Sequence, residues 1–218
     1  MARGKELCVA AEIVHRRADI RRATSLRDLD VHVIPLDDDD DDVFLPWTAT
    51  QYEVVLEYRT SDLSWKVQCT YRDVRRYLKR VRSLAKNAKC ARLQQLRAET
   101  RRIVLCAIFA EKAPVIAKLL SLVFVAMAAT ANQVATCDVH RDLLHATNDF
   151  CAIEYPLELR ASQLMRQMSL VHGVEDDCCI CLCAGDGSHV ALRCGHVFHE
   201  ACICVWYSTR LNCPVCRQ

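Results

Sequence analysis

Cysteine and histidine side chains are concentrated near the C-terminal end of this 218-residue sequence. Nine of the 15 cysteines lie between residues 178 and 216. Within this cluster, four pairs of residues have the short spacing that lets a tight turn aim two side chains at one metal ion. These pairs are Cys178 and Cys181, Cys194 and His196, His199 and Cys202, and Cys213 and Cys216. Because zinc takes four ligands, the eight side chains predict two zinc sites.

Three further cysteines in the cluster, Cys179, Cys183 and Cys204, complicate the choice of ligands. Cys179 could pair with Cys183, and Cys204 lies beside Cys202 in the sequence. The register chosen above uses both CxxC pairs of the cluster and leaves no ligand over, so we interpret these three cysteines as non-ligands. Neither ion then keeps an open position for water, which predicts structural zinc rather than hydrolytic zinc.

The order of the ligands, three cysteines, two histidines and three cysteines, resembles the two-histidine subtype of the RING finger over residues 175–218. A plant-homeodomain finger would have a second CxxC before its one histidine, and this sequence does not. In the RING family the four pairs interleave. The resemblance therefore implies that Cys178, Cys181, His199 and Cys202 bind the first zinc ion, and that Cys194, His196, Cys213 and Cys216 bind the second. A module this small buries too little apolar area to fold unaided, so zinc must supply folding free energy.

RING fingers mostly act as ubiquitin ligases, and the resemblance implies that function here. They bind a ubiquitin-conjugating enzyme charged with ubiquitin and bring it to a protein substrate. Ile180, Trp206 and Pro214 match the family positions that form a shallow apolar groove for the conjugating enzyme. Packing inside the small zinc-built core is the other interpretation of these residues. Arg217 matches a cation that bridges the conjugating enzyme and the donor ubiquitin, a task that suits a planar guanidinium with five donors.

The runner-up function is a non-catalytic zinc-binding adaptor that binds partner proteins without a charged conjugating enzyme. The matches at Ile180, Trp206 and Arg217 argue against it.

The preceding four fifths of the chain predict an α+β domain with a hairpin and helices at residues 29–154, after an N-terminal extension at residues 1–28. Residues 51–58 and 63–71 are separated by a turn at 59–62, which predicts a β-hairpin, and residues 29–36 predict a further strand. The six aspartates at 37–42 predict a solvated loop, because they lack the spacing and the turn glycine of a calcium site.

From Arg72 onward, apolar residues recur at helical spacing. Residues 72–102 hold twelve Lys or Arg against Asp73 and Glu99, a local net charge of +10. One interpretation is a core helix with a solvated basic face. The other is a surface for an anionic lipid or for the acidic surface of another protein. A single aromatic residue, Tyr77, and the lack of a known reader motif argue against nucleic acid as a partner.

The same region also resembles a PX (phox-homology) lipid-binding domain, over about residues 29–150. The resemblance rests on two strands, the stretch 65–67, Tyr71, and a helix that opens with Asp73 and Val74. It implies a phosphoinositide-targeted adaptor function for this domain. In that family an arginine before the matching tyrosine holds the lipid phosphate, whereas this sequence has Thr70. It also lacks a proline-rich membrane loop after the first helix.

Two more helices are predicted before the zinc module. Residues 119–137 carry no charge, but their strongly apolar part spans only 13 residues, from Leu119 to Ala131. That length predicts a buried core helix rather than a membrane span. Residues 157–172 predict an amphipathic helix that ends at Gly173, within a helical linker at residues 155–174.

Composition supports a globular protein, with 52% hydrophobic and 26% charged residues. The net charge of +2 gives no general argument for nucleic acid. Glu6, Glu12 and Asp19 interrupt the N-terminal stretch, which therefore does not resemble a secretory signal. We accordingly predict an intracellular, cytoplasmic protein whose cysteines stay reduced or bind metal, with peripheral membrane association as an alternative.

Overall fold

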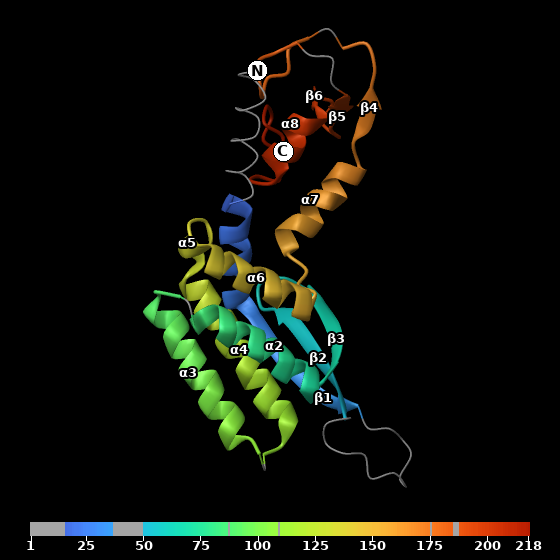
Figure 1. Cartoon of the computed structure of the whole chain (residues 1–218). Coiled ribbons are helices and arrows are strands. Elements are labelled where there is room, and N and C mark those ends of the chain that lie inside the picture. The colour runs from blue at the N-terminus through green and yellow to red at the C-terminus, as the bar shows by residue number, and fades with distance from the viewer. Residues whose placement is uncertain (1–15, 37–49, 87, 109, 175, 185–187) are drawn as a thin grey trace. The chain divides into compact units, whose positions relative to one another are not determined.

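The computed structural model describes residues 16–36, 50–86, 88–108, 110–174, 176–184 and 188–218, and its elements are labelled in Figure 1. The chain divides into two compact units. One comprises Asp19–Ile153, and the other contains Glu154–Gln218. The predicted aspartate loop at 37–42 lies outside the described residues.

The first unit contains a three-stranded antiparallel sheet in the order β1-β2-β3 (Figure 1). The strands are β1 (Leu29–Leu36), β2 (Gln51–Tyr58) and β3 (Ser64–Thr70), as the sequence predicts. The register sets Val54 of β2 opposite Val33 of β1 and Val67 of β3, so apolar side chains share one face. On the other face, Glu53 forms a 2.9 Å ion pair with Lys66. One face of the sheet therefore belongs to the core, and the other carries polar side chains.

Helices pack on the apolar face of this sheet or on one another. They are α2 (Tyr71–Lys86), α3 (Ala91–Cys106), α4 (Lys112–Ala129), α5 (Ala131–Val134) and α6 (Asp138–Cys151). Helix α4 packs on β1, α3 packs against both α2 and α4, and α6 packs against α2. The α+β prediction is thus confirmed for the mixture of helices and small sheets.

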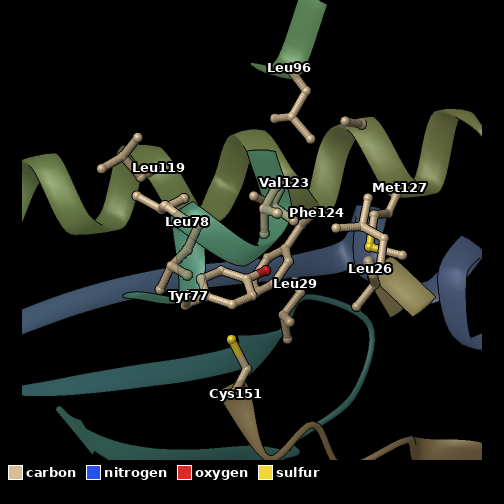
Figure 2. Close-up of a cluster of buried hydrophobic side chains, with 14 of the residues drawn as sticks. Leu26, Leu29, Tyr77, Leu78, Leu96, Leu119, Val123, Phe124, Met127 and Cys151 are labelled. Carbon is tan, nitrogen blue, oxygen red and sulfur yellow. The ribbon is translucent and has the colours of Figure 1, made fainter. Parts of the chain in front are cut away.

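Figure 2 shows the centre of this core, where side chains from α2, α4 and α6 meet. Phe124 of α4 is fully buried there. The Tyr77 ring stacks on Phe150 with centroids 4.5 Å apart. The Tyr77 hydroxyl lies 2.9 Å from the Thr147 hydroxyl, so its polar atom is satisfied in the apolar interior. Burial raises the pKa of Tyr77 well above its ordinary value.

Helix α4 covers most of the predicted core helix, but it begins seven residues earlier, at Lys112, and ends at Ala129, two residues before Ala131. Among the described residues, it is the one helix that is long and apolar enough to span a membrane by those two measures alone. However, Ile116, Leu120 and Phe124 are fully buried inside the unit. The apolar composition of α4 is therefore explained by the core into which it packs.

Thr70 caps the start of α2. Its hydroxyl donates to the Asp73 carboxylate at 2.6 Å and accepts the Asp73 N–H at 3.2 Å. The Thr70 N–H donates to the same carboxylate at 3.1 Å. This reciprocal capping box satisfies backbone donors at the helix start. Hydrogen bonding from the Thr70 side chain and backbone holds the pKa of Asp73 below its ordinary value.

The first unit begins earlier than the predicted boundary at residue 29. Residues 16–25 are helical and are followed by the 3-10 helix η1 (Leu26–Asp28). Ala23 and Leu26 are buried in the same core as the sheet. The compact unit therefore starts at Asp19, and residues 19–28 are part of it rather than an extension.

The second unit holds α7 (Pro156–Arg166), β4 (Ser169–Val171), β5 (His189–Ala191), β6 (Val197–His199) and α8 (Glu200–Tyr207). The strands form an antiparallel sheet in the order β4-β5-β6. The prediction of one helix over 157–172 is therefore wrong beyond Arg166. After a turn, Ser169–Val171 gain hydrogen-bonding partners on β5 that lie far away in sequence.

Helix α7 is part of the same packed unit as the zinc module. Ala161 belongs to its buried core together with Phe198, and Leu164 and Met168 pack against that core. The residues predicted as a helical linker thus contribute a helix and a strand to the fold.

Candidate metal centres

Each CxxC pair lies in a turn of the same construction, at residues 178–182 and 213–217. We call these the cysteine turns. The Leu182 N–H donates to the Cys178 carbonyl at 2.7 Å, and the Arg217 N–H donates to the Cys213 carbonyl at 2.9 Å. Leu182 and Arg217 have left-handed backbone, with φ of 57° and 61°. The turns bring both sulfurs of each pair into one cluster.

The first cluster comprises Cys178, Cys181, His199 and Cys202, whose ligand atoms all lie within 4.8 Å of one another. The Cys181 Sγ lies 3.3 Å from the His199 Nδ1, and the Cys202 Sγ lies 3.9 Å from it. A zinc tetrahedron requires a sulfur–nitrogen separation of about 3.5 Å. His199 ends β6, and Cys202 lies in the first turn of α8, so one strand-to-helix junction supplies two ligands.

The second cluster comprises Cys194, His196, Cys213 and Cys216, again with all ligand atoms within 4.8 Å. The His196 Nδ1 lies 3.4 Å from the Cys194 Sγ and 3.6 Å from the Cys213 Sγ. Gly195 separates the first two ligands with a φ of 85°, a conformation that glycine adopts without strain. Both clusters therefore have the ligand types and spacing that two zinc ions need.

The pairs interleave, because the first and third pairs share one cluster and the second and fourth share the other. Each cluster supplies four side-chain ligands, which fills a tetrahedral zinc and leaves no position for a reacting water. Cys179, Cys183 and Cys204 lie outside both clusters. The thiol of Cys204 instead lies 3.5 Å from the Met165 sulfur of α7.

The thiols of the first cluster differ in acidity. Burial raises the pKa of Cys178, but backbone N–H groups of His199, Ile180 and Cys181 stabilise its thiolate and leave the pKa below its ordinary value. Burial and the neighbouring Cys181 sulfur raise the pKa of Cys202 to about 12. A metal ion must therefore displace the proton of Cys202, which makes metal binding depend on pH.

The two histidines face their clusters through Nδ1. On the far side of the His199 ring, Nε2 is buried without a hydrogen-bond partner among the described residues. The His189 ring packs beside it, with centroids 4.5 Å apart. This orientation assigns Nδ1 of His199 as the ligand atom.

Comparison with known proteins gives a match for this segment. The Ring finger domain family model matches residues 176–217. Residues 176–217 form a RING-H2 finger. No solved structure matches the chain significantly.

The most similar relatives include plant proteins that share the finger. RING-H2 finger protein ATL29 of Arabidopsis thaliana is 47% identical over 45 residues, which are 19% of this chain and 16% of that protein. RING-H2 finger protein ATL80 of the same plant is 49% identical over 45 residues, 19% of this chain and 23% of that protein. E3 ubiquitin-protein ligase Os04g0590900 of Oryza sativa subsp. japonica is 46% identical over 44 residues, 19% of this chain and 12% of that protein. The chain thus spans less than a quarter of each of these relatives.

The PX resemblance receives no support from these comparisons, because the family match lies within the RING-H2 finger. The structure gives Thr70 a local role as the cap of α2. The resemblance to a PX domain therefore has neither a family match nor the arginine that holds the lipid phosphate in that family.

The predicted groove residues are partly covered. Ile180 and Trp206 pack against the core of the finger, and the Trp206 indole N–H donates to the Asn212 carbonyl at 2.8 Å. The Arg210 guanidinium lies 5.3 Å from the centre of the Trp206 ring. Pro214 is half-buried, like Ile180 and Trp206, so each of the three keeps an accessible edge.

Two apolar side chains that the sequence analysis did not select are more exposed. Leu182 is 76% exposed and Val215 is 50% exposed. Leu182 directly follows Cys181, and Val215 lies between Pro214 and Cys216. Leu182 and Val215 could have been predicted as surface residues from the sequence, because each lies directly beside a ligand of a cysteine turn.

Proposed function

We propose that this chain is a RING-type ubiquitin ligase that promotes transfer of ubiquitin from a conjugating enzyme to a substrate lysine. The observation that carries the proposal is a RING-H2 finger with two complete ligand clusters and with matching residues at the conjugating-enzyme positions. One of its relatives is itself named an E3 ubiquitin-protein ligase.

The conjugating enzyme binds to apolar side chains around the two cysteine turns. Ile180, Trp206 and Pro214 form the groove, and Leu182 and Val215 extend its apolar surface. Exposed large apolar side chains on a small module are typical of an interaction surface, because their burial against a partner is favourable. Zinc supplies the folding free energy that holds these turns in place.

Arg217 positions the donor ubiquitin. Its side chain is exposed, while its backbone N–H is fixed to the Cys213 carbonyl. The guanidinium can bond carbonyl oxygens of the conjugating enzyme and ubiquitin at once. The substrate amine then attacks the thioester carbonyl, and the conjugating enzyme's thiolate leaves. The finger contributes orientation, which raises the rate of a step that it does not perform itself.

A self-ubiquitination assay with a panel of conjugating enzymes tests this function. The full chain should stimulate discharge of at least one charged conjugating enzyme. Ile180→Ala and Trp206→Ala should weaken conjugating-enzyme binding, whereas Arg217→Ala should leave binding near normal and slow discharge. Arg166→Ala, an exposed arginine of α7 outside the groove, is the matched control and should change neither.

Failure of every conjugating enzyme to discharge, with both zinc ions present, would favour the non-catalytic zinc-binding adaptor. Normal discharge by Arg217→Ala would remove the positioning role of Arg217 while leaving the ligase function intact.

For the first unit, an anionic lipid or an acidic protein surface is the proposed partner of residues 72–102. Cations are exposed along both helices of this region, including Arg75, Lys79, Lys86, Arg92 and Arg101. If the partner of residues 72–102 is an anionic lipid, the protein associates peripherally with a membrane, and this association is part of the proposal.

A further inference from the structure

Helix α3 ends in a turn that leads to α4, so the two helices form a hairpin (Figure 1). Two large apolar residues at the tip of this hairpin are exposed. Leu105 is 60% exposed and Ile108 is 66% exposed. Most other large apolar residues of these helices, such as Leu96 and Ile116, are buried or partly buried, and Val125 of α4 is a further exposed one at 49%. The exposure of Leu105 and Ile108 at the tip of a helical hairpin therefore differs from the burial of most large apolar side chains in this unit.

Three backbone carbonyls of this turn are hydrogen-bonded from inside the protein. The buried Lys112 ammonium donates to the carbonyls of Ala107 at 2.7 Å, Ile108 at 3.2 Å and Ala110 at 2.7 Å. It also lies 5.6 Å from the centre of the Tyr71 ring. Carbonyls that are bonded internally need no water, so this turn can leave water at a low cost.

Cations lie beside the apolar tip. Arg101 and Arg102 are exposed and precede Leu105 by one helical turn. Arg75 and Arg82 of α2 lie near Arg101. Burial lowers the pKa of Arg82, and the positive charges of Arg75 and Arg101 lower it further. Such mutual repulsion is relieved by an anion.

These cations also lack acidic partners. In the part of the chain that the structure describes, Arg75, Arg82 and Arg101 form no ion pair, whereas Arg76 pairs with Asp73 and Arg80 pairs with Asp149. The charge beside the tip is therefore available to an external anion.

We propose that the tip of the α3–α4 hairpin docks on an anionic membrane surface. Leu105 and Ile108 insert among the lipid chains, and the neighbouring arginines contact lipid phosphates. An acidic protein surface would explain the charges, but it would leave unexplained two projecting apolar side chains on a turn with internally bonded carbonyls. Docking is peripheral, because α4 stays in the core. This proposal does not depend on the ligase function.

Vesicle sedimentation of the full-length protein tests the proposal. The protein should bind vesicles that mix phosphatidylcholine with phosphatidylserine, and it should not bind phosphatidylcholine alone. Raising the salt well above about 0.1 M should weaken binding, because screening shortens the reach of the arginine charges.

The double variant Leu105→Ser/Ile108→Ser should bind mixed vesicles at least roughly tenfold more weakly, because two aliphatic side chains no longer leave water. Leu170→Ser, at a 65% exposed leucine of the other unit, is the matched control and should bind normally. Arg75→Gln/Arg101→Gln should also weaken binding, whereas Arg166→Gln should not.

Ile108→Trp provides a gain of signal that a folding defect cannot mimic. Its fluorescence should shift to the blue when mixed vesicles are added, and binding should be kept. Unchanged binding by the serine double variant would overturn membrane insertion. So would binding to soluble polyglutamate in the absence of any binding to mixed vesicles, because that result would favour an acidic protein surface.

Discussion

The two units of this chain are stabilised by different means. The first unit buries a large apolar cluster that runs from Ala23 to Cys151, with Phe124 among its largest members. The second unit has a small cluster, and two of its buried members, Cys178 and Cys213, belong to the zinc-ligand groups. One unit thus folds by removing apolar surface from water, and the other depends on metal coordination. Loss of a metal ligand should therefore destabilise the second unit, and loss of buried apolar volume should destabilise the first.

The largest expected effect is loss of the finger when a ligand is removed. His199→Ala should reduce the zinc content from two ions per chain to one or fewer and unfold the finger. Zinc binding contributes about 10–16 kcal/mol to folding in zinc-finger peptides. Atomic absorption and hydrogen exchange read by mass spectrometry measure both outcomes. Cys179→Ala, beside a ligand but outside both clusters, should keep two zinc ions. A finger that stays protected after chelation would show that metal is not its main source of stability.

Removal of core volume should destabilise only the first unit. Phe124→Ala should lower its free energy of unfolding by about 3–5 kcal/mol, because a fully buried aromatic ring leaves a cavity. Val125→Ala, at the exposed neighbouring position on α4, is the control and should cost far less. Zinc content should remain two in both variants. Release of zinc by Phe124→Ala would mean that the two units unfold together.

Under the proposed ligase function, the two units are expected to differ as acceptors of ubiquitin. The chain has seven lysines, and none follows Lys118. The finger therefore offers no lysine amine, and its arginines stay protonated and cannot attack a thioester. Modified sites should map by mass spectrometry to exposed lysines of the first unit: Lys66, Lys79, Lys86, Lys89 and Lys118.

Lys112 sharpens this prediction, because its buried ammonium is bonded to three carbonyls. It should remain unmodified in the folded protein. Replacement of these five exposed lysines by arginine should remove most self-modification and leave discharge to free lysine unchanged. Persistent modification at Lys112 would show that the α3–α4 turn opens.

The smallest predicted effect concerns the cap of α2. Thr70→Ala should cost about 1 kcal/mol of stability in the first unit, the usual cost of losing a helix cap. Since the pKa of Asp73 is lowered in the folded state, its contribution is present above the unfolded pKa of about 4 and is lost as the pH falls through the folded value. The difference between wild type and variant should therefore shrink in acid. Thr70→Ser should retain the cap, and an equal loss of stability with serine would argue against a hydroxyl role.

The sequence predicted those features that depend on residue type at fixed spacing. The zinc clusters follow this rule, because Cys178 and Cys181 can share an ion in a short turn whatever lies elsewhere in the chain. The strands at Leu29–Leu36 and Gln51–Tyr58 also follow it, since their alternation is local. In contrast, β4 was missed because Ser169–Val171 become a strand only through pairing with β5.

Burial in a shared core was equally hard to predict. Ala23 and Leu26 gave no local sign that they pack beside the sheet. The exposure of Leu182, next to a ligand, was also missed, because apolar type alone does not tell a core residue from a surface residue.

Because of the left-handed backbone at Leu182 and Arg217, the surface that the finger presents depends on whether zinc is bound. Left-handed conformation costs a non-glycine residue about 1–2 kcal/mol, and each residue keeps it here because a cysteine turn holds its N–H. Without zinc the cysteine turns would relax, and both residues would return to ordinary backbone. The apolar surface at Leu182 and the cation at Arg217 would then be lost together. The fraction of chains that present both the Leu182 surface and the Arg217 cation should thus follow the free zinc concentration of the compartment. The two features should be gained or lost together.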